Sequence, residues 1–173
     1  MRKIGLLSDT HGYLPSQLME FFKDCDEIWH AGDWGDWSTY QTLKEFKPLV
    51  TVWGNIDAKE LRVEMPEYII FEREKVKVLL IHIGGYPGKY SAKCHELIKS
   101  HRPDVMVCGH SHILKVVSDK TYGLLHLNPG AAGYKGFHTL ATAIRFEINE
   151  EKLARLEVWE IPKRHLILEE DTV

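Results

Sequence analysis

The sequence predicts an α/β fold in which two mixed β-sheets face each other and helices flank the pair. Three observations support this class. Strand-like and helix-like stretches alternate over the first third of the chain, a β-rich hairpin pattern follows, and four further strand-like stretches come late in the sequence. Because 173 residues suffice for one domain with a buried core, we expect a single domain over residues 1–173.

The first third of the chain contains three strands, each followed by a polar loop. An uninterrupted run of apolar and small residues at 3–8 predicts a strand buried in a mainly parallel sheet, and the pattern repeats with strands predicted at 27–30 and 49–53. Helices are predicted between them, at residues 17–23 and 37–46. This order is typical of βαβ units.

Beyond the third strand the pattern changes. The β-rich stretches 68–71 and 76–81 are separated only by four charged residues, which favours a hairpin over a crossover helix. A helix is predicted at residues 91–100 and a strand at 104–108. Four more strands are predicted at residues 113–118, 124–127, 139–148 and 153–161.

The amino-acid composition limits which kinds of molecule the protein is expected to bind. The chain has 22 Lys and Arg against 25 Asp and Glu and no basic run, which argues against long nucleic acid and membrane surfaces as partners. The amino-terminal apolar stretch stops at Asp9, too early for a secretory signal, and no later stretch approaches a membrane span. Three separated cysteines, with no Cys-x-x-Cys pair, predict reduced thiols in a cytoplasmic protein: Cys25, Cys94 and Cys108.

Polar side chains follow five successive predicted strands at their carboxyl ends, the edge at which open α/β sheets bind ligands. All of them are oxygen or imidazole donors to a metal, and none is a thiolate. One such pair would mean little, because turn loops are rich in Asp and Gly. Chance would have to place donors at all five ends together. The seven donors are Asp9, His11, Asp33, Asn55, His82, His110 and His112.

With these motifs and the Asn128-Pro129-Gly130 turn, the sequence resembles the calcineurin-like metallophosphoesterases, and within them the compact YfcE-like phosphodiesterases. The resemblance implies a four-layer αββα sandwich. It also implies two divalent metal ions, with manganese the first choice and iron, zinc or nickel as alternatives. The implied ligands are Asp9, His11 and His112 at the first ion, Asn55, His82 and His110 at the second, and Asp33 bridging both.

The predicted donor set suits the hydrolysis of a phosphate ester. Two cations about 3.5–4 Å apart repel each other, so a shared carboxylate and a shared water or hydroxide are needed to hold them together. Asp33 would supply the carboxylate, and the bridging hydroxide would be the nucleophile. We therefore expect a dinuclear-metal-dependent phosphoesterase, most specifically a phosphodiesterase, acting on a small phosphate ester. The expected catalytic residues are Asp33, Asn55, His82 and His110.

Two positions depart from the family pattern. Many members have a histidine directly after the Gly-Asn motif, where it is thought to protonate the leaving oxygen, but Ile56 stands there and cannot donate a proton. The general acid is therefore unassigned. After His82, residues 83–85 read Ile-Gly-Gly where the subgroup usually has Gly-His. The candidate substrate-binding residues are His138, which is also a candidate acid, and Asn128.

Several other polar or aromatic side chains have two interpretations. His30 and His126 are predicted chiefly as hydrogen-bonded core residues. Asp36 and Asp57 could orient metal-bound imidazoles or be solvated loop charges. Four tryptophans could stack a nucleobase or fill the core: Trp29, Trp34, Trp37 and Trp53.

Two alternatives to a phosphodiesterase stay open. A retromer subunit with a similar fold serves chiefly as a protein-binding scaffold, so the fold alone does not establish hydrolysis. In such scaffolds the ligand set is eroded, whereas all seven positions are filled in this sequence. The other alternative is a small-nucleotide hydrolase of the same superfamily. The sequence fixes neither the natural substrate nor the oligomeric state, and a homo-oligomer remains an option.

Overall fold

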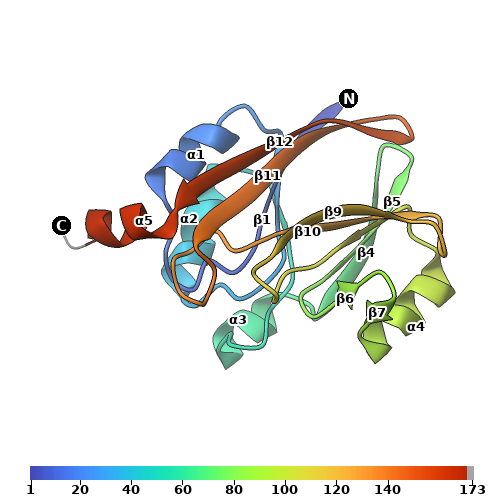
Figure 1. Ribbon diagram of the computed structural model, residues 1–173, viewed down its shortest axis with the longest axis horizontal. Coiled ribbons are helices and arrows are strands. Elements are labelled where there is room, and N and C mark those ends of the chain that lie inside the picture. The colour runs from blue at the N-terminus through green and yellow to red at the C-terminus, as the bar shows by residue number, and fades with distance from the viewer. Residues whose placement is uncertain (171–173) are drawn as a thin grey trace.

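The computed structural model describes residues 1–170; the side chains of Glu169 and Glu170 and residues 171–173 lie outside the description. Within residues 1–170 the chain forms two five-stranded sheets and a two-stranded ribbon. The two large sheets face each other, with helices on the outside (Figure 1). The predicted α/β class with two mixed, facing sheets is confirmed.

The first sheet has the strand order β12-β11-β1-β2-β3. Its strands are β1 (Arg2–Leu7), β2 (Glu27–His30), β3 (Leu49–Thr51), β11 (Leu140–Asn149) and β12 (Lys152–Pro162). The three amino-terminal strands are parallel, and helices α1 (Ser16–Phe22) and α2 (Trp37–Phe46) connect them, as the sequence predicts. The β11–β12 hairpin extends the sheet antiparallel to β1.

The second sheet has the strand order β4-β5-β8-β10-β9. Its strands are β4 (Tyr68–Arg73), β5 (Val76–Ile81), β8 (Val105–Val107), β9 (Leu114–Asp119) and β10 (Leu124–Pro129). The predicted hairpin is β4–β5, and β5, β8 and β10 run parallel. Helix α4 (Ala92–His101) crosses from β5 to β8, and the Ser91 side chain caps it by accepting from the Cys94 N–H.

Three clusters of buried apolar side chains fill the spaces between the layers. The largest lies between the sheets, where Leu6 and Trp29 of the first sheet belong to the same cluster as Val78 and Leu80 of the second. A second cluster joins α1 and α2 to the first sheet, and a third joins α4 to the second sheet. Each fully buried Leu or Val side chain in these layers stabilises the fold by roughly 1.5–3 kcal/mol through removal of apolar surface from water. The layers therefore run helix, sheet, sheet, helix.

Four short elements were not predicted from the sequence. They are α3 (Lys59–Glu64), β6 (Gly85–Tyr86), β7 (Lys89–Tyr90) and α5 (Lys163–Glu170). Within helix α3 only Leu61 is buried, and the buried Met65 comes directly after the helix. Six residues with one buried apolar position are too few to show a helical period. The two-residue strands β6 and β7 fall below the length at which alternation can be recognised. The other predicted elements lie within two residues of the observed boundaries at each end, and β2, α2 and β5 match them at both ends.

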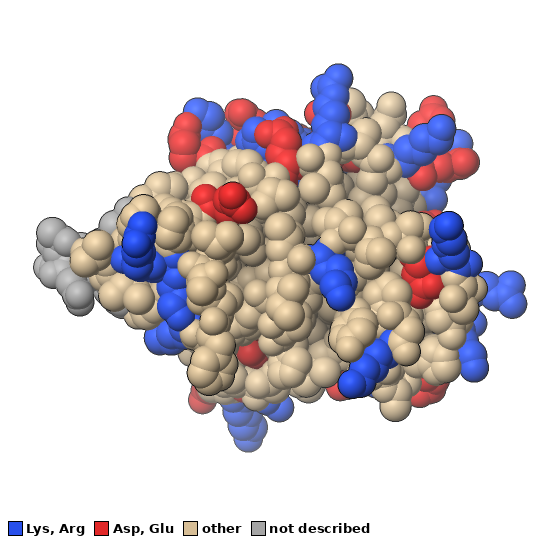
Figure 2. Space-filling view, viewed as in Figure 1, with Lys and Arg blue, Asp and Glu red and all other residues tan. Residues whose placement is uncertain are grey.

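Charged side chains show no gathering of one sign on the face drawn in Figure 2, where blue and red groups intermix around the margin and the centre is mostly uncharged. Within residues 1–170, no helix combines the length and the apolar composition needed to cross a membrane. The three cysteines are buried and unpaired. Burial raises the thiol pKa to about 11 at Cys25 and to about 12 at Cys94 and Cys108, so these thiols are poor nucleophiles.

Candidate metal centre

The loops that follow β1, β2, β3, β5 and β8 bring the seven predicted donors together at one edge of the sandwich. Two groups form there, each with a carboxylate and two imidazoles whose ligand atoms lie within 4.8 Å of one another. The first group is Asp9, His11 and His112, and the second is Asp33, His82 and His110. Asn55 joins the second group through its side-chain oxygen.

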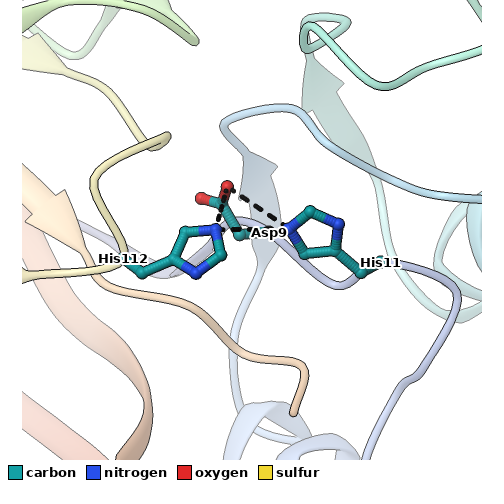
Figure 3. Close-up of side chains that lie close together, drawn as sticks. All are labelled: Asp9, His11 and His112. Atoms are coloured by element: carbon teal, nitrogen blue, oxygen red, sulfur yellow. Dashed lines mark hydrogen bonds and ion pairs between the residues drawn. The ribbon is translucent and has the colours of Figure 1, made fainter. Parts of the chain in front are cut away.

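The first group has the spacing of ligands around one cation (Figure 3). Asp9 Oδ1 lies 3.1 Å from His112 Nε2 and 3.8 Å from His11 Nε2, and the two nitrogens are 3.2 Å apart. Ligand atoms about 2.0–2.2 Å from a shared ion are roughly 3–3.5 Å from each other, a range that the 3.1 and 3.2 Å separations meet and the 3.8 Å separation slightly exceeds. Asp9 is 0% exposed, and its Oδ1 has no hydrogen-bond partner within the described chain. A buried carboxylate oxygen is unfavourable without a counter-charge, so these residues fit a cation.

His138 sets the tautomer of His112. His138 Nε2 lies 2.9 Å from the Gly133 carbonyl oxygen, so this nitrogen carries the proton and donates it. His138 Nδ1 is then an acceptor, and it lies 3.2 Å from His112 Nδ1, which must donate. The Nε2 lone pair of His112 is consequently left free and faces Asp9. This is the arrangement in which a second imidazole orients a metal ligand.

The second group is more open. His82 Nε2 lies 3.2 Å from Asp33 Oδ1 and 3.1 Å from Asn55 Oδ1. His110 Nδ1 lies 2.8 Å from the same Asn55 oxygen. His82 is buried and directs Nδ1 at the Ala31 carbonyl oxygen, 2.7 Å away, which leaves Nε2 for a ligand. Asn55 and His110 are exposed, so this group can be reached from solvent.

Asp33 lies between the two groups. Its Oδ2 is 3.9 Å from His11 Nε2 of the first group, while its Oδ1 faces His82 of the second and accepts from the Ile56 N–H at 3.1 Å. One carboxylate thus offers an oxygen to each side. This is the position expected of a bridging ligand.

The pKa shifts indicate that this site favours positive charge at His82 and negative charge at Asp33. Burial opposes charge on His82, but its hydrogen bond with Asp33 and the nearby Asp9 and Asp33 carboxylates outweigh burial and raise the His82 pKa. Burial likewise acts to raise the Asp33 pKa, yet the His82 contacts and the Ile56 N–H lower it overall. Burial lowers the His11 pKa. The negative charge that causes both His82 and Asp33 shifts would also favour a bound cation.

Five of the seven donors have a left-handed backbone, which is uncommon for residues other than glycine. Each such residue costs roughly 1–3 kcal/mol, and such positions cluster at functional sites. The five φ angles are 54° at Asp9, 50° at His11, 58° at Asp33, 68° at His110 and 57° at His112. The sharp turns direct the side chains into one centre.

Hydrogen bonds between the loops hold this strained backbone. Asp9 N–H donates to the Gly32 carbonyl at 3.0 Å, and His11 N–H donates to the Asp33 carbonyl at 3.1 Å. The His110 N–H donates to Asp9 Oδ2 at 3.1 Å, which leaves Oδ1 as the free oxygen of that carboxylate. The first two loops and the His110 loop are therefore fixed to one another.

Two glycines allow the loops to approach this closely. A Cβ at Gly54 would lie 2.0 Å from Asp33 Oδ1, and a Cβ at Gly109 would lie 2.0 Å from Ser8 Oγ. The same Cβ at Gly54 would also lie 2.3 Å from the Asp33 backbone nitrogen, and that at Gly109 would lie 2.7 Å from Asp9 Oδ2. The Gly-Asn and Gly-His motifs thus need glycine for close approach.

Asp57 and Arg62 support the site in a way that sequence reasoning missed. Asp57 is buried and accepts from the backbone N–H groups of Asp33, Gly35 and Gly54, so it binds loops and not imidazoles. Burial raises its pKa. Arg62 of α3 donates to the Asp57 and Asn55 carbonyl oxygens at 2.7 and 2.8 Å. The place of Asp57 two residues after Asn55 was a usable signal, whereas nothing in the sequence around Arg62 indicates its role.

The remaining polar side chains considered for the site form hydrogen bonds that stabilise the fold. His30 is buried, accepts from the Gly32 N–H and stacks on Trp34 with ring centroids 3.5 Å apart, in accord with a core role. Asn128 donates to the Gly109 carbonyl and Ser111 Oγ, so its amide braces the loop of the last two histidines. Asp36 accepts from the Thr39 N–H and caps α2.

The tryptophans divide between core and surface. Trp29 and Trp34 are fully buried in the core, Trp37 is exposed, and Trp53 is partly buried beside Asn55. His126 is buried, and its Nδ1 has no partner within residues 1–170. Burial, with a smaller contribution from the Lys115 charge, lowers the His126 pKa to about 4.

The fold and the paired donor groups together define a metallophosphoesterase-type centre. Comparison with known families gives the same class: the profile described as the calcineurin-like phosphoesterase superfamily domain matches residues 2–151. The chain belongs to this superfamily.

Individual relatives carry related names. A probable metallophosphoesterase of Methanothermobacter thermautotrophicus is 31% identical over 135 residues, covering 74% of this chain and 76% of the relative. A phosphodiesterase of Methanocaldococcus jannaschii is 28% identical over 152 residues, covering 76% and 86%. The crystal structure of zinc-complexed Vps29 from Entamoeba histolytica superposes with a TM-score of 0.72 at 16% identity, covering 93% of this chain and 99% of that one. This last likeness shows a shared fold.

Proposed function

We propose that this protein is a dinuclear-metal-dependent phosphodiesterase acting on a small phosphate ester, with manganese as the first candidate metal and iron, zinc or nickel as alternatives. The observation that carries the proposal is the Asp33 carboxylate, whose two oxygens face two separate donor groups. The proposed ligands are Asp9, His11 and His112 for one ion, Asn55, His82 and His110 for the other, and Asp33 for both.

The chain's own residues would act as follows. Asp33 would neutralise charge on both sides, and His82 would offer Nε2, because Nδ1 is engaged by the Ala31 carbonyl. The exposed Asn55 and His110 would lie next to the substrate phosphate. Bound cations would supply a water acidic enough to be the nucleophile and positive charge for the phosphoryl oxygens.

Ile56 shapes the proposed substrate range. Its side chain is 47% exposed and stands beside the centre, with its N–H on Asp33, but it has no proton to give to a leaving oxygen. His138 lies nearby, yet both of its nitrogens are engaged by Gly133 and His112. Diesters with good leaving groups need little protonation, so they are the favoured substrates.

We further propose one domain over residues 1–173 and a cytoplasmic location; the number of subunits is left open.

The test is hydrolysis by chelator-treated protein with each metal added back. We expect bis(p-nitrophenyl) phosphate to be hydrolysed after manganese is restored, faster than an alkyl monoester, and activity to disappear again with chelator. Small nucleotides in the same panel test the nucleotide-hydrolase alternative. Lack of hydrolysis with manganese, iron, zinc and nickel would favour the scaffold alternative, with which the likeness to Vps29 is compatible.

A further inference from the structure

A cavity of about 180 Å³ lies beside the second donor group, between the loop after β3 and the loop after β5. Its lining includes Asn55 and His82, so a group bound in it would adjoin a phosphate held at the candidate metal centre. Trp53 and Ile83 contribute its large apolar surfaces. The cavity is therefore a preformed space next to the proposed chemistry.

Trp53 is held in place as part of the cavity wall. The Arg62 guanidinium carbon lies 4.5 Å from the Trp53 ring centroid, a cation–π contact. Arg62 is itself fixed by donating to the Asn55 and Asp57 carbonyl oxygens. The Trp53 main chain is fixed as well, because its backbone N–H donates to the Pro66 carbonyl at 3.0 Å. A wall fixed in this way loses little conformational entropy when a ligand packs against it.

Size and charge indicate which chemical group fits. Besides His82, the ionisable side chains lining the cavity are Glu67 and Lys93, one of each sign, so the lining favours neither an anion nor a cation. A dry apolar cavity of about 150 Å³ is known to admit benzene. The volume beside Trp53 is thus suited to one uncharged six-membered ring.

We propose that this cavity binds an uncharged aromatic ester arm of a phosphodiester while the phosphate lies at the donor groups. The proposal rests on the phosphodiesterase function and deepens it, because it names the substrate class. Trp53 and Ile83 are the specificity-determining residues. Recognition of the ring by Trp53 raises the affinity for aryl over alkyl phosphoryl compounds.

The experiment measures binding, so that it is separate from hydrolysis. Phenylphosphonate and methylphosphonate are titrated calorimetrically into manganese-loaded protein. We expect wild type to bind the phenyl compound at least about tenfold more tightly, as expected for an apolar group in an apolar pocket. Trp53→Ala, which removes the wall, and Ile83→Trp, which fills the cavity from a partly exposed position, should each remove that preference. Intrinsic differences between the two ligands cancel in the ratio of variant to wild type.

Trp37→Ala is the matched control, because Trp37 is 41% exposed on α2 and does not line the cavity. It should retain the wild-type preference. A wild type without preference, no binding of either compound, or an unchanged preference in Ile83→Trp would overturn the proposal. The phosphodiesterase function is tested separately by hydrolysis. Binding with the expected preference but without diester hydrolysis would support the aromatic site and contradict the phosphodiesterase function. Hydrolysis without the preference would support the phosphodiesterase function and contradict the aromatic site.

Discussion

The two donor groups differ in how firmly the fold holds their side chains. In the first, all three donors have a left-handed backbone, Asp9 is fully buried, and His112 is oriented by His138. In the second, Asn55 and His110 are exposed and contact each other through the Asn55 oxygen. The first group is a fixed set of ligands, while two of the four side chains in the second are exposed to solvent.

This difference suggests a division of work. A fixed group loses little entropy when it takes up a cation, so we expect the first group to bind metal more tightly. The exposed group has room for substrate and water, and the cavity beside Trp53 opens on that side. Three of the five strained donors, each costing roughly 1–3 kcal/mol, belong to the first group. Four predictions test this comparison, in order of expected effect.

Asp33→Ala should have the largest effect, because Asp33 is shared by both groups. Removing its carboxylate takes away one of the two oxygens that face His82 Nε2 and removes the charge between the groups. We expect hydrolysis to fall at least about a thousandfold and both metal-binding steps to weaken. Steady-state kinetics and calorimetry measure these effects. Asp24→Ala, an exposed aspartate outside the centre, is the control. Loss of only one metal step would show that Asp33 does not bridge.

His112→Ala and His110→Ala compare the groups directly. His112 belongs to the fixed group and His110 to the exposed one. We expect His112→Ala to weaken the tighter manganese-binding step by more than about a hundredfold, since loss of a direct ligand should exceed loss of its orienting partner. His110→Ala should affect the weaker step instead. If both variants weaken the same step equally, the groups are not separate sites.

His138→Ala tests whether orientation of His112 matters. The His138 ring engages His112 Nδ1 and the Gly133 carbonyl. Its loss should reduce metal affinity at the first group about 10–100-fold, the usual effect of removing a group that orients a ligand, and leave the second step unaltered. His95→Ala, which removes an imidazole bonded to Tyr122 elsewhere, is the control. An unchanged first step with lost activity would instead favour His138 as a substrate contact or acid.

His126 provides the smallest test, because it is a buried imidazole outside both groups. Its pKa is lowered to about 4 from 6.5, so its stabilising effect is present above pH 6.5 and is lost as the pH falls toward 4, where the unfolded chain binds the proton first. Between pH 7 and 5, metal-free wild type should lose about 2 kcal/mol more unfolding free energy than His126→Gln. Urea denaturation measures this difference. The donor groups contribute equally to both proteins and cancel in the comparison, so equal losses would mean that folding does not lower the His126 pKa.

Much of the fold and the donor set could be predicted because both depend on patterns of residues that are close together in the sequence. Apolar runs ending in Asp, Asn or His gave the strands and placed all seven donors at one edge. The short helix α3 escaped detection because six residues with little buried surface show no period. Its Arg62 supports Asn55 and Trp53 only after the chain folds.

The roles of His138 and Asp57 also depended on the folded chain. His138 is 26 residues from His112, and only the geometry shows that its second nitrogen is already used by Gly133. Asp57 was weighed as a partner of imidazoles, but its oxygens accept from backbone N–H groups of three loop residues. Local sequence identifies a polar residue near a site, whereas its partners are set by tertiary packing.

The most direct test of the two-group account is the order in which metal enters the protein. Metal-stripped crystals soaked at rising manganese concentration and measured by anomalous scattering would show each position separately. The account predicts that the position among Asp9, His11 and His112 fills first and that a second peak then appears among Asp33, Asn55, His82 and His110. A single peak at saturating manganese, or first filling at the exposed group, would contradict it.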